Sequence, residues 1–190
     1  MASTHSYKVI SLFSGAMGLD IGLENTGRFQ VIACVEKEPT FCETIRANLS
    51  AGRLHRSLKV FERDIVDLDA TEVLNAVGLK PGELDVLVGG PPCQSFSTVG
   101  KRRTTEDPRG TLLWHFLRFI EAMKPKFFLM ENVRGLLSAA LRHRPIAKRP
   151  EYGGPPLDAD EEPGSVVRLF ANDLQAARHI TDLMEPLSGQ

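Results

Sequence analysis

Short apolar runs alternate with stretches of helical periodicity along most of this chain. Five runs rich in apolar and β-branched residues predict strands, at residues 7–13, 30–35, 58–61, 84–88 and 127–130. The stretches between them predict helices, at residues 19–26, 40–49, 70–77 and 111–123. This alternation predicts an α/β fold with an open, mainly parallel sheet of about five strands.

The last third of the chain has a different pattern. Residues 134–149 are basic, and residues 151–164 form a Pro/Gly-rich stretch with an acidic patch. Residues 165–187 have apolar positions at helical spacing and predict a helix that faces a core. We see no internal repeat and no clear second domain, and we expect one domain over residues 1–190.

Composition argues against a strongly basic nucleic-acid-binding protein, a disulfide-rich or zinc protein and a membrane protein. The 190 residues are 42% hydrophobic and 25% charged, with a net charge of -1, so any contact with DNA must come from local patches. Three cysteines without paired spacing predict neither a disulfide framework nor a zinc site, and Cys34 and Cys42 read as core residues. No apolar run is long enough to cross a bilayer, and we expect a cytoplasmic protein.

Three candidate functional groups stand where predicted strands end. The strand at 84–88 runs into a Gly-Gly-Pro-Pro-Cys turn that places Cys93 where open α/β sheets bind ligands. The first strand runs into a glycine turn at residues 14–18, and Glu36 ends the second strand. This layout suits a nucleotide-type ligand, with Glu36 as acceptor for ribose hydroxyls. A βα turn without a ligand and a solvated strand-end charge fit the same residues.

Three stretches, in this order, resemble motifs of the DNA cytosine-5 methyltransferases. They are residues 12–19 (Leu-Phe-Ser-Gly-Ala-Met-Gly-Leu), 91–97 (Pro-Pro-Cys-Gln-Ser-Phe-Ser) and 131–133 (Glu-Asn-Val). Because each follows a predicted strand, together they are more specific than any one alone. The resemblance implies a Rossmann-like sheet of the S-adenosylmethionine-dependent type, and an enzyme of restriction-modification systems that methylates cytosine in DNA.

The resemblance also assigns residue roles. Cys93 would attack carbon 6 of a cytosine flipped out of double-stranded DNA, and Glu131 would support ring nitrogen 3. An inert buried cysteine and a Glu131–Arg134 pair are the alternatives. The cofactor S-adenosylmethionine would contact Phe13, Ser14, Gly15, Gly18, Glu36, Asp64, Ile65, Pro91 and Leu112. An N-cap or loop acid remains the alternative for Asp64, with Asp67 and Asp69 nearby.

The chain departs from the family pattern in several places. Ser11 stands where the family usually has Asp, and Met17 stands where it has a third Gly. The Gln-x-Arg-x-Arg motif, the variable target-recognition region and the late Asn-containing motif are missing, so we expect an incomplete sheet. An apolar edge at residues 127–130 would be a liability unless another chain covers it.

These departures leave three hypotheses. The chain is the catalytic part of a cytosine-5 DNA methyltransferase, truncated or completed by a second chain that supplies the missing motifs. Alternatively, it is an inactive remnant that binds S-adenosylmethionine or a partner, or it acts on tRNA. The basic loop at 94–110 is either a lid that closes over DNA or an exposed charged loop, and Trp114 reads as a packing residue.

Overall fold

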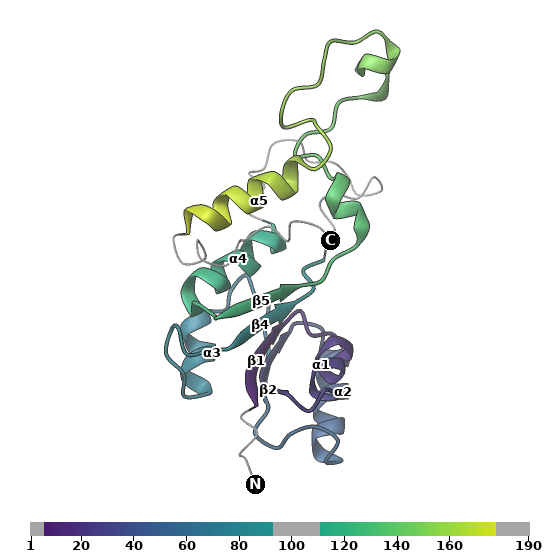
Figure 1. Cartoon of the computed structure of the whole chain (residues 1–190). Helices are drawn as coiled ribbons and strands as arrows, with labels where there is room; N and C mark the ends of the chain where they lie inside the picture. Colours follow the sequence, from purple (N-terminus) through teal and green to yellow (C-terminus); the bar gives the residue numbers. More distant parts are fainter. Residues whose placement is uncertain (1–5, 93–110, 178–190) are drawn as a thin grey trace. The chain divides into compact units, whose positions relative to one another are not determined.

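The computed structural model describes residues 6–92 and 111–177 (Figure 1). The chain divides into two compact units. The first comprises Met1–Pro92 and His115–Glu131, and the second comprises Cys93–Trp114 and Asn132–Gln190. The boundary falls within helix α4, which spans Leu112–Met123.

The first unit is built on a five-stranded sheet in the order β3-β2-β1-β4-β5, with every neighbouring pair parallel. Its strands are β1 (Tyr7–Leu12), β2 (Phe29–Glu36), β3 (Lys59–Glu62), β4 (Val86–Gly89) and β5 (Phe127–Met130). The helices α1 (Gly18–Glu24) and α2 (Pro39–Ser50) lie on one side of the sheet, and α3 (Ala70–Ala76) lies on the other (Figure 1). The predicted parallel α/β sheet and its five strands are confirmed.

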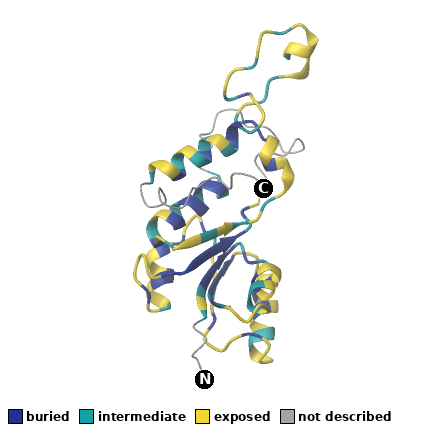
Figure 2. Cartoon of the chain, in the orientation of Figure 1, coloured by how far each residue is buried: buried dark blue, intermediate teal, exposed yellow. Residues whose placement is uncertain are grey.

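The core of this unit is the middle of the sheet and the helix faces that cover it. All four residues of β4 are buried, as are the last four of β1, which explains why these strands read as continuous apolar runs (Figure 2). Cys34 and Cys42 are both fully buried free thiols, and burial raises the pKa of Cys34 to about 12. The prediction that these two cysteines are core residues is confirmed.

Gly89 lies where two strands and a helix approach closely. Its register partner on β1 is Leu12, and a Cβ atom at Gly89 would lie 2.7 Å from the Leu12 carbonyl oxygen and 2.9 Å from Phe116 Cε2. Backbone cannot move aside as a flexible side chain can. The glycine is therefore required by packing within the protein, before any ligand is considered.

The second unit packs around helix α5 (Ser165–Ala176). Val166, Phe170 and Leu174 on α5 are buried. Trp114 is 6% exposed, its indole N–H donates to Asp173 Oδ2 at 2.8 Å, and its ring meets Phe170 edge-on. The predictions of a core-facing helix and of a packing role for Trp114 are confirmed, while residues 178–187 of the predicted helix lie outside the described residues.

The rest of this unit is largely irregular. Three short 3₁₀ helices follow β5 in the chain: η3 (Arg134–Ser138), η4 (Ile146–Lys148) and η5 (Pro150–Tyr152). Within the part of the chain that the structure describes, no helix is both long and apolar enough to cross a membrane.

We expect Gly89→Ala to lower the free energy of unfolding by about 1–3 kcal/mol, because the added methyl overpacks a site closed by backbone. Gly22→Ala is the matched control: it lies in α1, and its Cβ would meet nothing within 4 Å. That change should be neutral or stabilising by up to about 1 kcal/mol, since alanine favours a helix. Urea unfolding of both variants measures the difference, and equal stabilities would contradict the close approach.

Candidate active site at the carboxyl edge of the sheet

A glycine turn follows β1 and has an unusual backbone. Phe13, Gly15 and Met17 all adopt left-handed conformations, with φ of 55°, 52° and 67°. The turn is held by hydrogen bonds from the Ser14 N–H to the Val35 carbonyl at 3.3 Å and from the Met17 N–H to the Ser14 carbonyl at 2.8 Å. A bulky residue with positive φ is strained, and such strain concentrates at functional sites.

Met17 occupies the position at which the family usually has a third glycine. The residue sits at the N-cap of α1 in the left-handed region, where glycine has no steric penalty. Its side chain is 1% exposed and belongs to the core cluster around Val9 and Val31. The methionine thus keeps the same turn, and burial of its side chain offsets the strain of about 1–3 kcal/mol.

Glu36 joins the end of β2 to this turn. Its carboxylate accepts hydrogen bonds from the N–H groups of Gly15 at 2.7 Å, Lys37 at 2.8 Å and Glu38 at 2.9 Å. The side chain is therefore more than a solvated charge, since it is 8% exposed and fixes the position of Gly15. Three of its roughly four acceptor sites are used within the protein, and its contact with a ribose remains a prediction.

Asp64 and Ile65 follow β3, at the same edge of the sheet. Asp64 Oδ1 accepts from the Val66 N–H at 3.0 Å, and Lys37 Nζ is 3.8 Å from Asp64 Oδ2. Ile65 is 4% exposed, and its carbonyl accepts from Arg118. The N-cap of α3 is Asp69, which accepts from the Thr71 N–H at 2.8 Å. Asp64 is thus a loop acid and not an N-cap, and the adenine contact stays a prediction.

The ends of β4 and β5 come together at Gly89 and Gly90, a few residues before Cys93. The Glu131 N–H donates to the Gly89 carbonyl at 3.0 Å, and a Cβ at Gly90 would lie 3.0 Å from Glu131 Oε2. Pro91 is buried directly after this point. Cys93 and the loop at 94–110 lie outside the described residues, and Leu112 begins α4 in the second unit.

A cavity of about 340 Å³ lies at this edge of the first unit. It brings together Phe13, Ser14 and Glu131, three of the positions singled out in the sequence. Gly15, Gly18, Glu36, Asp64, Ile65 and Pro91 are outside its lining. The full lining is Ser11, Leu12, Phe13, Ser14, Leu19, Asp20, Gly89, Gly90 and Glu131.

Asp20 is the residue of this cavity that sequence reasoning missed. It is 1% exposed, and neither carboxylate oxygen has a hydrogen-bond partner among the described residues. Burial raises the pKa of Asp20 to about 6, while the neighbouring Ser11 hydroxyl favours the charged form and partly opposes this rise. The sequence held a signal, because Asp20 follows the apolar Met17 by three positions, a spacing that brings two side chains to one side of a helix start.

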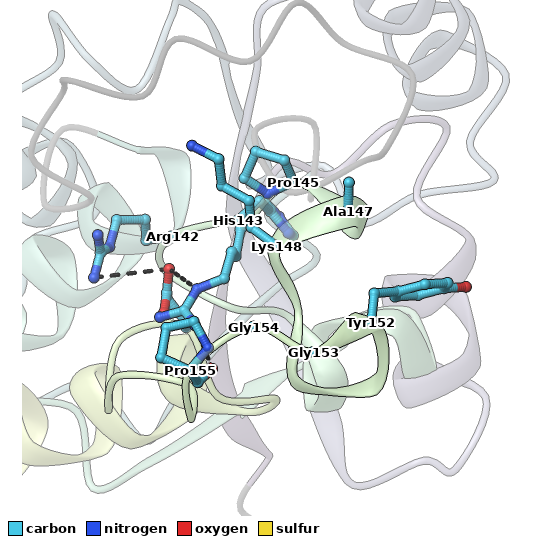
Figure 3. Close-up of a pocket in the computed structure, with 11 residues that line it drawn as sticks. Arg142, His143, Pro145, Ala147, Lys148, Tyr152, Gly153, Gly154 and Pro155 are labelled. Carbon is cyan, nitrogen blue, oxygen red and sulfur yellow. Dashed lines mark hydrogen bonds and ion pairs between the residues drawn. The ribbon is translucent and has the colours of Figure 1, made fainter.

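A second cavity, of about 500 Å³, lies in the second unit and is lined by residues between Arg142 and Glu161 (Figure 3). Its arginines are already paired. Arg144 binds the Glu161 carboxylate and the Pro155 carbonyl, and Arg142 contacts Asp158 at 2.5 Å and Asp160 at 2.9 Å. The pairing with Arg144 lowers the pKa of Glu161. Arg142 and Arg144 are therefore neutralised by the acidic patch, and this cavity is the weaker candidate for chemistry.

We expect Asp20→Asn to stabilise the protein above pH 6. Because the folded pKa of about 6 exceeds the unfolded 3.8, the native state holds a proton that the unfolded state has lost, so wild-type stability falls as pH rises from about 4 to 7. Two pKa units correspond to about 3 kcal/mol. Urea unfolding at pH 4.5 and 7.5 should show the variant's advantage growing with pH, and a constant difference would contradict a buried charge.

Comparison with known proteins identifies the family of this chain. The family model described as "C-5 cytosine-specific DNA methylase" matches residues 7–145. The type II methyltransferase M.AquIA of Picosynechococcus is 44% identical over 131 residues, covering 69% of this chain and 50% of the relative. M.FnuDI of Fusobacterium nucleatum is 40% identical over 131 residues, covering 69% and 33%.

Among solved structures, a mutant of Spodoptera frugiperda DNMT2 matches with a TM-score of 0.49 and 22% identity, covering 68% of this chain and 36% of that one. The chain spans half or less of the length of the two curated relatives named above. The family model nevertheless covers well over half of the present chain, including every strand of its sheet. The chain belongs to the C-5 cytosine-specific DNA methylase family.

Proposed function

We propose that this chain is the cofactor-binding and nucleophile-bearing part of a DNA (cytosine-5-)-methyltransferase, a partial catalytic domain over residues 1–190. One observation carries the proposal. The glycine turn after β1, the strand end that leads to Cys93, and Glu131 after β5 converge on one cavity at the carboxyl edge of the sheet. Ligands of open α/β sheets bind at that edge.

The described residues fit S-adenosylmethionine. Gly15 has a positive φ and nothing within 4 Å of its Cβ position, so the turn leaves space for a ligand. Phe13 presents an aromatic ring in the cavity lining, and Glu36 and Asp64 place carboxylates at the neighbouring strand ends. The cofactor, when bound there, supplies an electrophilic methyl group on a sulfonium. Gly18, Ile65, Pro91 and Leu112 complete the proposed contacts.

Cys93 is proposed to act as the nucleophile. Its thiolate adds to carbon 6 of the target cytosine, and the electron pair of the ring's 5,6 double bond becomes available at carbon 5. After carbon 5 has taken the methyl group, loss of the proton at carbon 5 restores the double bond and expels the thiolate. The other two cysteines are buried and have raised pKa values, which leaves Cys93 as the reactive thiol of the chain.

Glu131 is proposed to stabilise the ring during this addition. Negative charge develops on the pyrimidine as the thiolate attacks, and a carboxyl group that hydrogen-bonds or protonates nitrogen 3 compensates it. The backbone supports this role, because the Glu131 N–H is anchored on the Gly89 carbonyl, four residues before Cys93. The side chain is exposed at the end of β5, where a base can reach it.

Double-stranded DNA is the proposed partner, with the target base flipped out of the helix because its carbon 6 is hidden in the stack. A second chain is proposed to supply target recognition. The supporting observation is β5, an edge strand of the described sheet on which Phe127 is 59% and Leu129 43% exposed. These alternate positions form an apolar face at the sheet's edge, which a second chain can cover. Chromosomal DNA as substrate would place the reaction in the cytoplasm of a prokaryotic cell.

The decisive experiment is covalent trapping. The purified chain is incubated with S-adenosylmethionine and a duplex containing 5-fluorocytosine in varied contexts, alone and with any chain encoded beside it. Because fluorine cannot leave as a proton does, a working Cys93 accumulates as a protein–DNA adduct. We expect Cys93→Ala to abolish the adduct, and denaturing electrophoresis measures it.

Glu131→Gln should slow adduct formation about 10²–10⁴-fold while leaving binding of S-adenosylmethionine intact, because an amide cannot donate a proton to nitrogen 3. Glu151→Gln, an exposed acid in the second unit, is the matched control and should react like wild type. A folded wild-type protein that forms no adduct under either condition would favour an inactive remnant. Trapping on a tRNA carrying 5-fluorocytidine and not on DNA would overturn the choice of substrate.

A further inference from the structure

Asp20 is a buried carboxylate with no evident use inside the first unit. It lies on α1, 1% exposed, and neither oxygen is hydrogen-bonded among the described residues. A buried ionisable group without a partner is costly to a folded protein, so its presence needs a reason outside the fold. Because the same side chain lines the cavity at the carboxyl edge of the sheet, that reason can be a ligand.

The charge of the cavity indicates which ligand group Asp20 suits. The described lining holds two carboxylates, Asp20 and Glu131, and no lysine, arginine or histidine. The remaining positions are serines, glycines and the apolar residues Leu12, Phe13 and Leu19. Such a lining repels anions and attracts a cation, and its apolar walls strengthen the attraction by excluding water.

We propose that Asp20 is the ion-pairing partner of the positively charged amino-acid end of S-adenosylmethionine. That end carries two cationic groups, the ammonium and the sulfonium, beside one anionic α-carboxylate, and either cation can meet the carboxylate of Asp20. The inference rests on the proposed function and extends it. Asp20 would recognise the positive charge of the cofactor, which the backbone N–H groups of the glycine turn cannot do.

The other three carboxylates of this edge, Glu36, Asp64 and Glu131, are less suited to the task. Asp64 accepts from the Val66 N–H and has Lys37 Nζ 3.8 Å away. Glu36 already accepts three backbone N–H groups and is held in the turn. Glu131 is exposed and is assigned to the pyrimidine ring. Asp20 combines enclosure with unused acceptor capacity, the combination that gives an ion pair its strength in a protein.

A pH dependence follows from this placement. Among the described residues, the groups that act on Asp20 or share its cavity are the Ser11 hydroxyl on β1, the Cys34 thiol on β2, Glu24 on α1 and Glu131 after β5. These neighbours include no cation, so Asp20 holds its proton up to about pH 6 in the absence of a ligand. Binding of the cation requires the charged carboxylate and therefore weakens as pH falls below about 6.

The test compares three ligands by calorimetry on the full chain at pH 7.5. S-adenosylmethionine carries both cations, S-adenosylhomocysteine keeps the ammonium, and 5′-methylthioadenosine carries neither. Asp20→Asn should weaken S-adenosylmethionine at least about tenfold and leave 5′-methylthioadenosine within about twofold. Loss of S-adenosylhomocysteine binding assigns the ammonium to Asp20, and its retention assigns the sulfonium.

Glu24→Gln is the matched control, an acid on the same helix whose carboxylate accepts from the Val31 N–H outside the cavity. It should bind all three ligands like wild type. Wild-type affinity for S-adenosylmethionine should also fall between pH 7 and pH 5, while that of Asp20→Asn stays flat.

Unchanged affinity in Asp20→Asn, or equal weakening of all three ligands, would overturn the role of Asp20 and leave the proposed function standing. A folded wild type that binds none of the three would refute the proposed cofactor site itself, and this inference with it.

Discussion

The register of β1 between β2 and β4 is the constraint on which the candidate site depends. Leu12, the last residue of β1, is paired with Val35 on one side and with Gly89 on the other. Because all three strands run in parallel, the residues that follow each of them emerge at the same edge. A slip of one residue in either pairing would turn every side chain of a strand to the opposite face and separate the glycine turn from the strand that leads to Cys93.

Two glycines near this register serve different physical needs. Gly89 is required because Leu12 and Phe116 leave no space for a Cβ atom, which is a demand of the core. Gly15 has open space around it and is required by its positive φ, which lets the turn present its backbone and lets the Gly15 N–H reach the Glu36 carboxylate. Packing explains the first glycine completely, whereas the open space beside the second is where a ligand can approach.

The two buried carboxylates of the site, Glu36 and Asp20, differ in whether the protein itself uses them. Glu36 is buried and accepts three backbone N–H groups, so it stabilises the turn. Asp20 is buried, neither of its oxygens has a hydrogen-bond partner among the described residues, and the Ser11 hydroxyl only partly favours its charged form. It therefore destabilises the free protein at neutral pH and remains available to a ligand. A stable fold tolerates one such group when a cation bound beside it can restore the lost interaction.

The sequence by itself determined the elements, their alternation and the motifs at strand ends, because apolar periodicity and glycine or proline punctuation are local signals. It therefore predicted β5 to the residue, the other strands to within a residue or two, and the core positions of Cys34, Cys42 and Trp114. It also singled out Phe13, Ser14 and Glu131, three residues that line the cavity.

Only the tertiary structure decided which of these residues meet. The strand order, the contact that requires Gly89, the use of Glu36 as a backbone acceptor and the enclosure of Asp20 all depend on residues distant in the chain. The same holds for the pairing of Arg142 and Arg144 with the acidic patch, which neutralises these two arginines of the basic stretch. Such long-range contacts leave no periodic pattern in the sequence, because they follow from how the strands pack and not from any local signal.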